Sequence, residues 1–496
     1  MLNMQKKLTN VFYSILSLPA TAMGFALSIQ ISALSWILST KYNLAIHEVG
    51  LVWAAGPIAG ILGQVIIGII SDNVWLWNGR RRPFILIGGV LAALMLLALP
   101  NIDVISSSLG VNGILGVAIS VALTLDLSIN ISFNPTRSII ADVTPDGVER
   151  TKGYTWMQTV SGTFGVLAYV IGAVWSNYIL IYFGVGLVLI LSIIPTFFIE
   201  EPRILKQSDE SAKQGKIKTS AMGILMLIEP LWGFLLYAVY AIVARLANFH
   251  PDNYYIEIFC LVITVIFIVK VLITKSDGKD NSEKGIIAYK KILAAHSFTW
   301  IGIQTMFVYM FAYVQFKVYG LGEGAEISDQ VNLEMGRIVS IGFLILSAVA
   351  AVLPALVLEP ITRKIGRVKT HLICIASMAA GYALMLFLGF SATSIYIIMA
   401  ILGIGWASTI SLPFAIMSQE IDQSRMGLFM GLFNLSVVLP QMVASFGVGQ
   451  AVSSVPDKSL IFIISTATLA VSAVLWLMVK ETGDSQIEKA TAPSAH

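Results

Sequence analysis

The stretch Gly79-Arg-Arg-Arg-Pro-Phe84 carries three consecutive arginines between two long apolar segments. A second basic stretch, Thr362-Arg-Lys-Ile-Gly-Arg-Val-Lys369, occupies the corresponding place later in the chain, because each follows the second apolar segment of a set of six. Basic residues gather in the cytoplasmic loops of membrane proteins. Their recurrence at matching positions indicates a helical membrane protein built from two similar halves.

The composition agrees with a chain that lies in a bilayer. The mean hydropathy is +0.83, and only 12% of the residues are charged, roughly half the usual share in soluble domains. The net charge of +3 is small and gives no indication of a nucleic-acid partner. Two cysteines and five scattered histidines provide neither a disulfide framework nor metal-ligand spacing. We therefore predict an all-α polytopic membrane protein with no metal site and no cofactor.

The order of the apolar segments predicts the organisation of the chain. We expect an N-terminal six-helix half, a central linker, a C-terminal six-helix half and a polar cytoplasmic tail, at residues 1–200, 201–290, 291–480 and 481–496. The linker contains two further apolar segments, about 221–244 and 255–274, each long enough to span a bilayer. About 14 transmembrane helices follow, with both termini in the cytoplasm. Alternatively, the inserted pair lies on or beside the bundle without serving its function.

The segment Leu125–Asp142 places two charges, Asp126 and Arg137, in otherwise apolar sequence. An ionisable side chain at bilayer depth costs on the order of 3 kcal/mol even on a lenient scale, so a functional role is the default. The two residues are eleven positions apart, which puts them within about 20° of one helix face. Asn130 shares that face, and Pro135 is able to bend the helix beneath it. The alternative is that Asp126 is a packing residue and Arg137 reaches the membrane surface.

Several motifs occur in a fixed order along the chain. They are Pro57-x-x-Gly60-x-x-x-Gln64, Ser71-Asp72, Gly79-Arg-Arg-Arg-Pro-Phe84, Asp126-x-x-x-Asn130-x-x-x-x-Pro135-x-Arg137-x-x-x-Ala141-Asp142, and Met426-Gly-Leu-Phe-Met-Gly-Leu-Phe-Asn434 followed by Val438-Leu-Pro-Gln441. Together they resemble the major facilitator superfamily, in particular its branch of sucrose and glycoside:proton symporters from plants, animals and bacteria. The predicted seventh span, Phe298 to Tyr309, lacks the paired aspartates of plant members. It is closer in character to bacterial relatives, which implies a bacterial cytoplasmic (inner) membrane.

The resemblance implies the major facilitator fold and a cytoplasmic gate. In that family the glycine–arginine loop and nearby acids belong to contacts between helix ends that break when the protein opens inward. The matching residues here are Asp72, Gly79, Arg80, Arg81, Arg82, Asp142, Gly366 and Arg367. An effect on membrane topology alone is the alternative, because arginines in these loops would orient the chain in any case.

A sugar site needs hydrogen-bonding groups for many hydroxyls and aromatic rings for apolar faces. The candidates in the apolar spans are Gln30, Gln64, Asp126, Asn130, Arg137, Gln158, Trp300, Gln304, Trp406, Asn434 and Gln441. Asn434 and Gln441 are seven residues apart, about two turns, and so share one face. For any single amide, a hydrogen bond between packed helices is the alternative.

The missing ATP-binding loop and the acid Asp126 within an apolar segment together predict the energy source for transport. No Gly-x-x-x-x-Gly-Lys-Ser/Thr loop occurs, so ATP is not expected to drive transport directly. Asp126 is the best candidate for proton coupling, because burial favours its neutral form and a wetted cavity its carboxylate. The resemblance implies the same role, since the family couples sugar entry to protons through the matching acid. Sodium coupling is the alternative.

These observations predict a secondary active transporter and no enzyme. It would import a glycoside, a disaccharide or short oligosaccharide such as sucrose or maltose, by alternating access, with the proton gradient as its energy source. The expected partners are the sugar, protons and membrane lipid, with no obligate protein partner. One alternative is a facilitator-superfamily carrier for another solute, such as a cation-coupled melibiose-type symporter or an exporter. The other alternative is a membrane enzyme or a sugar sensor. The sequence shows no nucleophile–base pair that would indicate an enzyme.

Overall fold

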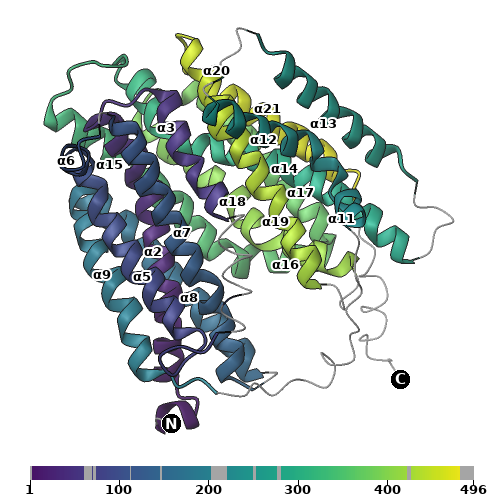
Figure 1. Ribbon diagram of the computed structural model, residues 1–496. Helices are drawn as coiled ribbons and strands as arrows, with labels where there is room; N and C mark the ends of the chain where they lie inside the picture. The colour runs from purple at the N-terminus through teal and green to yellow at the C-terminus, as the bar shows by residue number, and fades with distance from the viewer. Residues whose placement is uncertain are drawn as a thin grey trace. The chain divides into compact units, whose positions relative to one another are not determined.

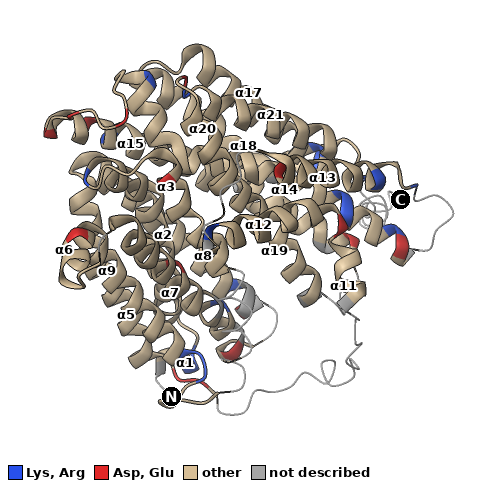
Figure 2. Cartoon of the chain, turned by 45° about the horizontal axis from the view of Figure 1, so that its top comes forward, with Lys and Arg blue, Asp and Glu red and all other residues tan. Residues whose placement is uncertain are grey.

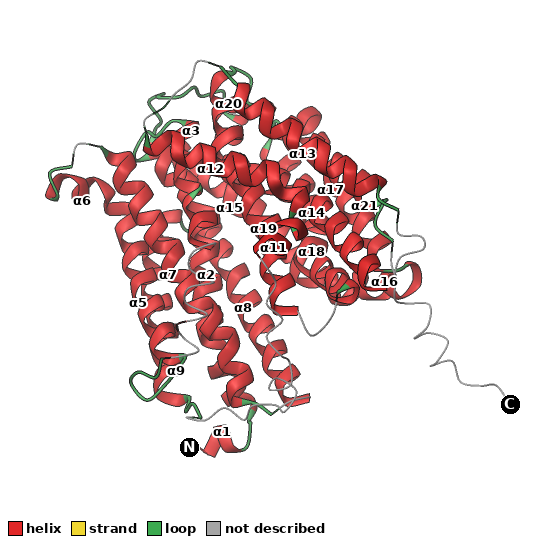
Figure 3. Ribbon diagram, turned by 45° about the vertical axis from the view of Figure 1, so that its right-hand side comes forward, coloured by secondary structure: helices red, strands yellow, loops and turns green. Residues whose placement is uncertain are grey.

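A computed structural model gives the fold of the 496-residue chain. The structure describes residues 3–60, 70, 74–111, 113–145, 148–202, 221–247, 249, 253–275, 281–421 and 426–480. Throughout these residues the regular elements are helices (Figure 3), and an isolated bridge between Leu76 and Gly79 is the one β-type pairing. The prediction of an all-α membrane protein is confirmed.

The chain forms two compact units. Unit 1 comprises Met1–Asp209, Phe307–Ser347 and Gly449–Lys458, and unit 2 comprises Glu210–Met306, Ala348–Val448 and Ser459–His496. The helices that lie wholly in unit 1 are α1 (Asn3–Lys6), α2 (Asn10–Thr40), α3 (Ile46–Trp53), α5 (Arg82–Ala98), η1 (Leu99–Asn101), α6 (Ile102–Ser108), α7 (Ile114–Val143), α8 (Val148–Val174), α9 (Asn177–Phe198), η3 (Val314–Val318) and α20 (Gly449–Ser454).

Two long helices contribute to both units, α14 (Asn281–Tyr313) and α15 (Asp329–Leu353). The remaining described helices belong to unit 2. They are α11 (Ala221–Leu227), η2 (Glu229–Leu231), α12 (Trp232–Leu246), α13 (Tyr255–Ile273), η4 (Pro354–Leu358), α16 (Glu359–Ile365), α17 (Arg367–Leu388), α18 (Ala392–Glu420), α19 (Met426–Val443), η6 (Ala444–Val448) and α21 (Leu460–Trp476).

Eleven stretches of helix in the described part of the chain are long and apolar enough to cross a membrane, and α21 is a shorter apolar helix. Charged residues lie mainly at helix ends and in loops (Figure 2), where a bilayer tolerates them best. The first inserted segment, expected over 221–244, is interrupted. It divides into α11 and α12 at η2, where Pro230 removes a backbone donor. The count of fourteen spans and the side of the termini stay predictions.

Within unit 1, helices α2, α5, α7, α8 and α9 run side by side (Figure 1). Helix α5 packs between α7 and α9 through two adjacent glycines. A Cβ on Gly88 would lie 2.6 Å from the carbonyl oxygen of Ser128, and one on Gly89 would lie 2.0 Å from Ser192 Oγ. Small residues at these positions therefore allow the close helix contacts on which α7 depends for its placement.

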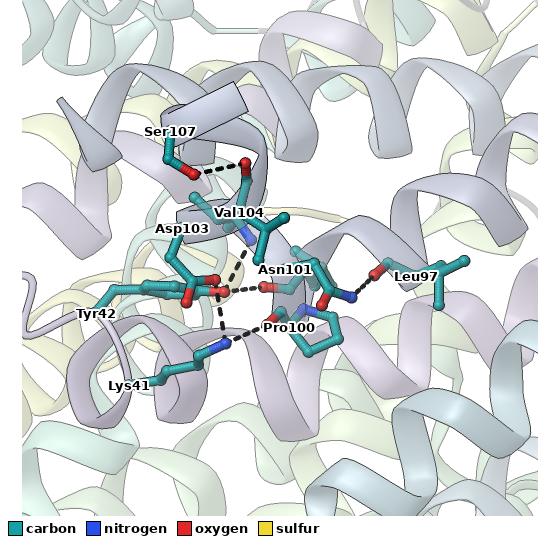
Figure 4. Close-up of polar contacts among 10 residues, drawn as sticks. Lys41, Tyr42, Leu97, Pro100, Asn101, Asp103, Val104 and Ser107 are labelled. Atoms are coloured by element: carbon teal, nitrogen blue, oxygen red, sulfur yellow. Dashed lines mark hydrogen bonds and ion pairs between the residues drawn. The ribbon is translucent and has the colours of Figure 1, made fainter. Parts of the chain in front are cut away.

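A polar clamp joins the end of α2 to η1 and α6 (Figure 4). Tyr42 Oη donates to the carbonyl oxygen of Leu99 at 2.8 Å and accepts from the Ile102 amide at 3.0 Å. Burial raises the pKa of the Tyr42 phenol, so the hydroxyl stays protonated and donates. Lys41 Nζ adds an ion pair with Asp103 at 3.2 Å. The clamp fixes the end of unit 1 opposite the arginine loop.

In unit 2 the inserted helices are attached to α14 through one buried carboxylate. Glu229 in η2 accepts from Lys270 of α13 at 2.8 Å and from Lys290 of α14 at 2.9 Å. Further along α12, the Phe234 ring lies edge-on to Phe298 of α14, with centroids 5.9 Å apart. The inserted pair therefore packs against the first helix of the predicted second half.

Candidate functional site

The central acid of the sequence analysis lies buried between two helices of unit 1. Asp126 on α7 is 5% exposed, and Gln30 on α2 is 4% exposed. Gln30 Nε2 donates to Asp126 Oδ2 at 3.0 Å. Gly56 lies opposite, since a Cβ there would be 3.4 Å from the same oxygen. An ionisable group and an amide predicted separately are thus brought into direct contact at the centre of the helix packing.

The other predicted residues of α7 lie along the same helix in different surroundings. Asn130 Nδ2 donates to the carbonyl oxygen of Asp126 at 2.8 Å. Arg137 is exposed, with its guanidinium 4.3 Å from the centre of the Phe133 ring. The helix continues without a break through Pro135. The acid is therefore enclosed, whereas the guanidinium is accessible from outside the packed helices.

Gln158 lies on an exposed polar face of α8. This face also carries three threonines at helical spacing, Thr155, Thr159 and Thr163, all exposed. The hydroxyls of Thr159 and Thr163 donate to carbonyl oxygens one turn earlier, at 2.9 and 2.8 Å. Threonines bonded in this way are tolerated in lipid, but a glutamine amide such as that of Gln158 is costly to place against lipid tails. The face is therefore suited to a water-filled cavity.

Two predicted aromatic residues meet in unit 2. The rings of Trp300 on α14 and Trp406 on α18 are 6.0 Å apart and edge-on, and both are half-buried. Trp300 Nε1 donates to Nε2 of His296 one turn earlier, at 2.9 Å. His296 also stacks on Phe433 of α19, with centroids 4.8 Å apart. Three helices thereby fix the orientation of the Trp300 ring.

Two predicted amides also form a pair in unit 2. Gln441 Nε2 on α19 donates to Oε1 of Gln304 on α14 at 3.2 Å, and Gln304 is buried. Gln304 lies one turn beyond Trp300 on the same helix. Asn434 is half-buried on α19. The unit therefore holds a ring pair and an amide pair on adjoining turns of α14.

The predicted gating residues form contacts near the start of α5. Arg81 Nε donates to Asp142 Oδ2 at 3.0 Å, which joins α5 to the end of α7. The backbone amides of Arg80, Arg81 and Arg82 all donate to the carboxylate of Glu201, at 2.7, 2.8 and 2.7 Å. Gly79 leaves room for this carboxylate, because a Cβ there would lie 2.8 Å from Glu201 Oε1. These contacts join α5, α7 and the segment that follows α9.

The remaining gating candidates fall in two places. Gly366 has a φ of 88° and closes α16, and Arg367 begins α17 directly after it. A positive φ of this size favours glycine. Asp72 of the gating set and Gln64 of the binding set lie outside the described residues.

Sequence reasoning missed Glu201, His296 and a polar seam in unit 1. The seam consists of Ser32, Asn177 and Ser340. Ser32 Oγ and Ser340 Oγ are 2.8 Å apart, and Ser340 Oγ donates to Asn177 Oδ1 at 3.1 Å. Serine and asparagine are common in membrane helices, so the sequence does not distinguish these three residues from others of their type. Their burial together in the structure does.

Further contacts extend the seam between α2 and the segments of α14 and α15 in unit 1. Ser35 Oγ donates to the carbonyl oxygen of Val308 at 2.8 Å, and Trp36 Nε1 donates to that of Asn332 at 3.2 Å. On the neighbouring elements, Lys317 pairs with Asp457 at 3.0 Å. Helices far apart in the sequence are therefore fastened together at the end of unit 1 opposite the arginine loop.

The family model of the Major Facilitator Superfamily matches residues 16–445. The chain belongs to this superfamily. The resemblance deduced from the motifs is thereby confirmed, and the protein is a multi-pass membrane transporter, not an enzyme.

Individual relatives of this facilitator-superfamily protein are distant. It is 23% identical over 490 residues to the sucrose transport protein SUC4 of Arabidopsis thaliana, covering 87% of this chain and 82% of the relative. It is 28% identical over 174 residues to the general alpha-glucoside permease of Schizosaccharomyces pombe, where the match spans 32% of this chain and only 31% of the permease. The nucleoside transporter NupG shares the fold, with a TM-score of 0.57, 13% identity and coverage of 96% of this chain and 100% of that one.

Proposed function

We propose that the protein imports a glycoside, a disaccharide or short oligosaccharide such as sucrose or maltose, together with protons. The relatives support a sugar, because their names specify sucrose and α-glucosides. The buried Gln30–Asp126 pair is the observation that carries the proposal. A carboxyl group enclosed by membrane-spanning helices is costly to ionise there, so its presence calls for a function.

Asp126 is the proton carrier in this proposal. While α2 and α7 enclose it, desolvation favours the neutral acid; when water reaches it, the carboxylate is favoured. The acid takes up a proton from the outside and releases it to the cytoplasm. Gln30 Nε2 is able to donate to either form, because both the carboxylate and the carbonyl oxygen of the acid accept hydrogen bonds. The amide therefore holds the side chain in place while its charge changes.

The sugar contacts proposed in unit 2 use the ring pair and the amide pair. The apolar C–H face of a pyranose ring packs against Trp300 or Trp406, since flat aromatic surfaces bury such faces at little entropic cost. Gln304 and Gln441 each have donors and acceptors to exchange with sugar hydroxyls. In unit 1, taken by itself, the exposed polar face with Gln158 offers hydrogen-bonding groups to a hydrated ligand.

The polar seam of Ser32, Asn177 and Ser340 is the outer gate in this proposal. Alternating access requires an outer seal that opens to admit the sugar and its proton. Small hydroxyl and amide groups suit that task, because each of their hydrogen bonds contributes only about 1 kcal/mol and water replaces them readily. On the opposite side, the Arg81–Asp142 ion pair between α5 and α7 belongs to the cytoplasmic gate of this proposal, whose contacts loosen when the protein opens inward.

Uptake into proteoliposomes tests the proposal. The purified protein is reconstituted with an imposed pH gradient, inside alkaline, and offered labelled sucrose, maltose, trehalose and longer glucosides. Accumulation of at least one glycoside that a protonophore abolishes is expected. Accumulation that requires a sodium gradient would show that sodium, and not the proton, is the coupling ion. No uptake from the whole panel would favour a carrier for another solute.

A further inference from the structure

Unit 2 contains a cavity of about 550 Å³ that the transport proposal does not use. Its lining comes from α16, α17 and the end of α21. The six lining residues are Lys364, Ile365, Lys369, Leu372, Ile373 and Leu477. Two of them are cations, four are aliphatic and none is acidic, so the cavity has a cationic part and an apolar part.

The chain reversal at Gly366 creates this arrangement. Helix α16 ends at Ile365, Gly366 takes a φ of 88°, and α17 begins at Arg367. Lys364 and Lys369 therefore lie on either side of one tight turn and reach the same cavity. The turn is held on both sides, because the Gly366 amide donates to the Thr362 carbonyl at 2.9 Å and Thr370 Oγ1 donates to the Gly366 carbonyl at 2.7 Å.

The apolar part of the cavity is open to the surroundings. Ile373, one turn beyond Lys369 on α17, is 54% exposed, and Leu477 at the end of α21 is 66% exposed. Isoleucine and leucine exposed beside lysines are typical of the level where acyl chains meet headgroups. The lysines therefore match the headgroup of a membrane lipid, and the exposed isoleucine and leucine match its acyl chains.

The charge pattern assigns this end of the helices to the cytoplasmic leaflet. Thr362–Lys369 contains four basic residues in eight positions and no acidic residue. By the positive-inside rule such a loop faces the cytoplasm. Anionic phospholipids give that leaflet its negative surface potential, and basic pockets between helices on that side bind their headgroups.

We propose that this cavity is a binding site for an anionic phospholipid of the cytoplasmic leaflet. The phosphodiester lies between the ammonium groups of Lys364 and Lys369, and an acyl chain follows Ile373 and Leu477. Lipids with a zwitterionic headgroup bind less well, because the lining offers no carboxylate for their ammonium group. The site is independent of the sugar and would be occupied whether or not the protein transports a glycoside.

Binding of fluorescent phosphatidylglycerol to the full-length protein in neutral detergent tests the site. We expect Lys364→Ala/Lys369→Ala to weaken this binding about 10- to 30-fold, as two lysine contacts to an anionic headgroup would. Lys6→Ala/Lys7→Ala, which removes the same charge from exposed lysines near the N-terminus, leaves the affinity unchanged. Lys364→Arg/Lys369→Arg retains binding, which shows that charge and not folding is measured.

Two further arms distinguish a lipid from a free anion. Phosphatidylcholine is expected to bind all four proteins weakly and equally, and Ile373→Ser to weaken phosphatidylglycerol binding without altering thermal stability in detergent. Equal phosphatidylglycerol affinity in the wild type and the double alanine variant would overturn the proposal. Complete displacement by millimolar inorganic phosphate would also overturn it, because the site would then recognise a free anion.

Discussion

At the scale of single residues, the position of a proton decides what Trp300 offers to a ligand. Its indole N–H is donated to His296 Nε2 at 2.9 Å, so that nitrogen must carry a lone pair and the histidine is neutral. His296 is 1% exposed, and its Nδ1 has no hydrogen-bond partner among the described residues. In the proposed site, Trp300 therefore has its ring and not its N–H left for a sugar.

Replacing His296 tests this positioning role. We expect His296→Leu to raise the KM for the transported sugar several-fold while the maximal rate changes less, because the ring loses its fixed orientation. His296→Gln keeps an acceptor and should recover part of the affinity. Ultraviolet resonance Raman spectra should show a weaker indole hydrogen bond in the leucine variant alone. His371→Gln alters a buried histidine bonded to Ser408 and serves as the control.

If His296→Leu transports with an unchanged KM and an unchanged indole spectrum, the hydrogen bond does not position Trp300. A fall in thermal stability with unchanged KM would assign His296 a purely structural role.

At the scale of elements, the inserted helices brace two helices of unit 2 that carry candidate sugar contacts. Glu229 joins η2 to α13 and α14, and Phe234 of α12 packs on α14. At the other end of α12, the Arg245 guanidinium lies 4.3 Å from the centre of the Phe446 ring in η6, directly after α19. The inserted pair therefore contacts α14 and the end of α19 at separate depths.

Removing the charge of Glu229 should loosen this brace. Glu229→Gln leaves Lys290 largely buried without its carboxylate, while Lys270 turns to solvent. We expect a loss of about 2 kcal/mol in the free energy of unfolding, below the range for fully buried pairs because Lys270 is exposed. Thermal unfolding in detergent measures it, with Glu323→Gln in an exposed loop as the control. Equal melting temperatures for both variants would show that the ion pairs do not hold the inserted helices.

At the scale of the whole molecule, the polar seam of unit 1 is expected to open in every transport cycle. Ser32 Oγ and Ser340 Oγ are 2.8 Å apart, close enough for the corresponding cysteines to form a disulfide with little movement. We expect Ser32→Cys/Ser340→Cys, in a background without Cys260 and Cys374, to lose uptake on oxidation and regain it on reduction. Each single cysteine variant should be insensitive. Transport at an undiminished rate by the cross-linked protein would show that this seam is not a gate.

Much of the fold was predictable from the sequence. Whether a segment spans the bilayer, and which side its loops face, depends on the hydropathy and charge of that segment and not on the helices that pack against it. The helix periodicity also put Asp126 and Arg137 on one face. It could not predict that one would be buried and the other exposed, since that depends on which helices pack at each depth. For the same reason the sequence could not predict the hydrogen bond from Gln30 to Asp126, or those from three backbone amides to Glu201. A partner ninety-six residues away is set by packing alone.

The most direct measurement of the central claim is sugar accumulation by Asp126→Asn in proteoliposomes under an imposed pH gradient. The amide at this position still accepts from Gln30 Nε2 but carries no proton to the cytoplasm. We predict loss of gradient-driven accumulation with sugar exchange retained, and normal accumulation by Glu326→Gln, an exposed acid in a loop. Full, protonophore-sensitive accumulation by Asp126→Asn would contradict the assignment of the proton to Asp126.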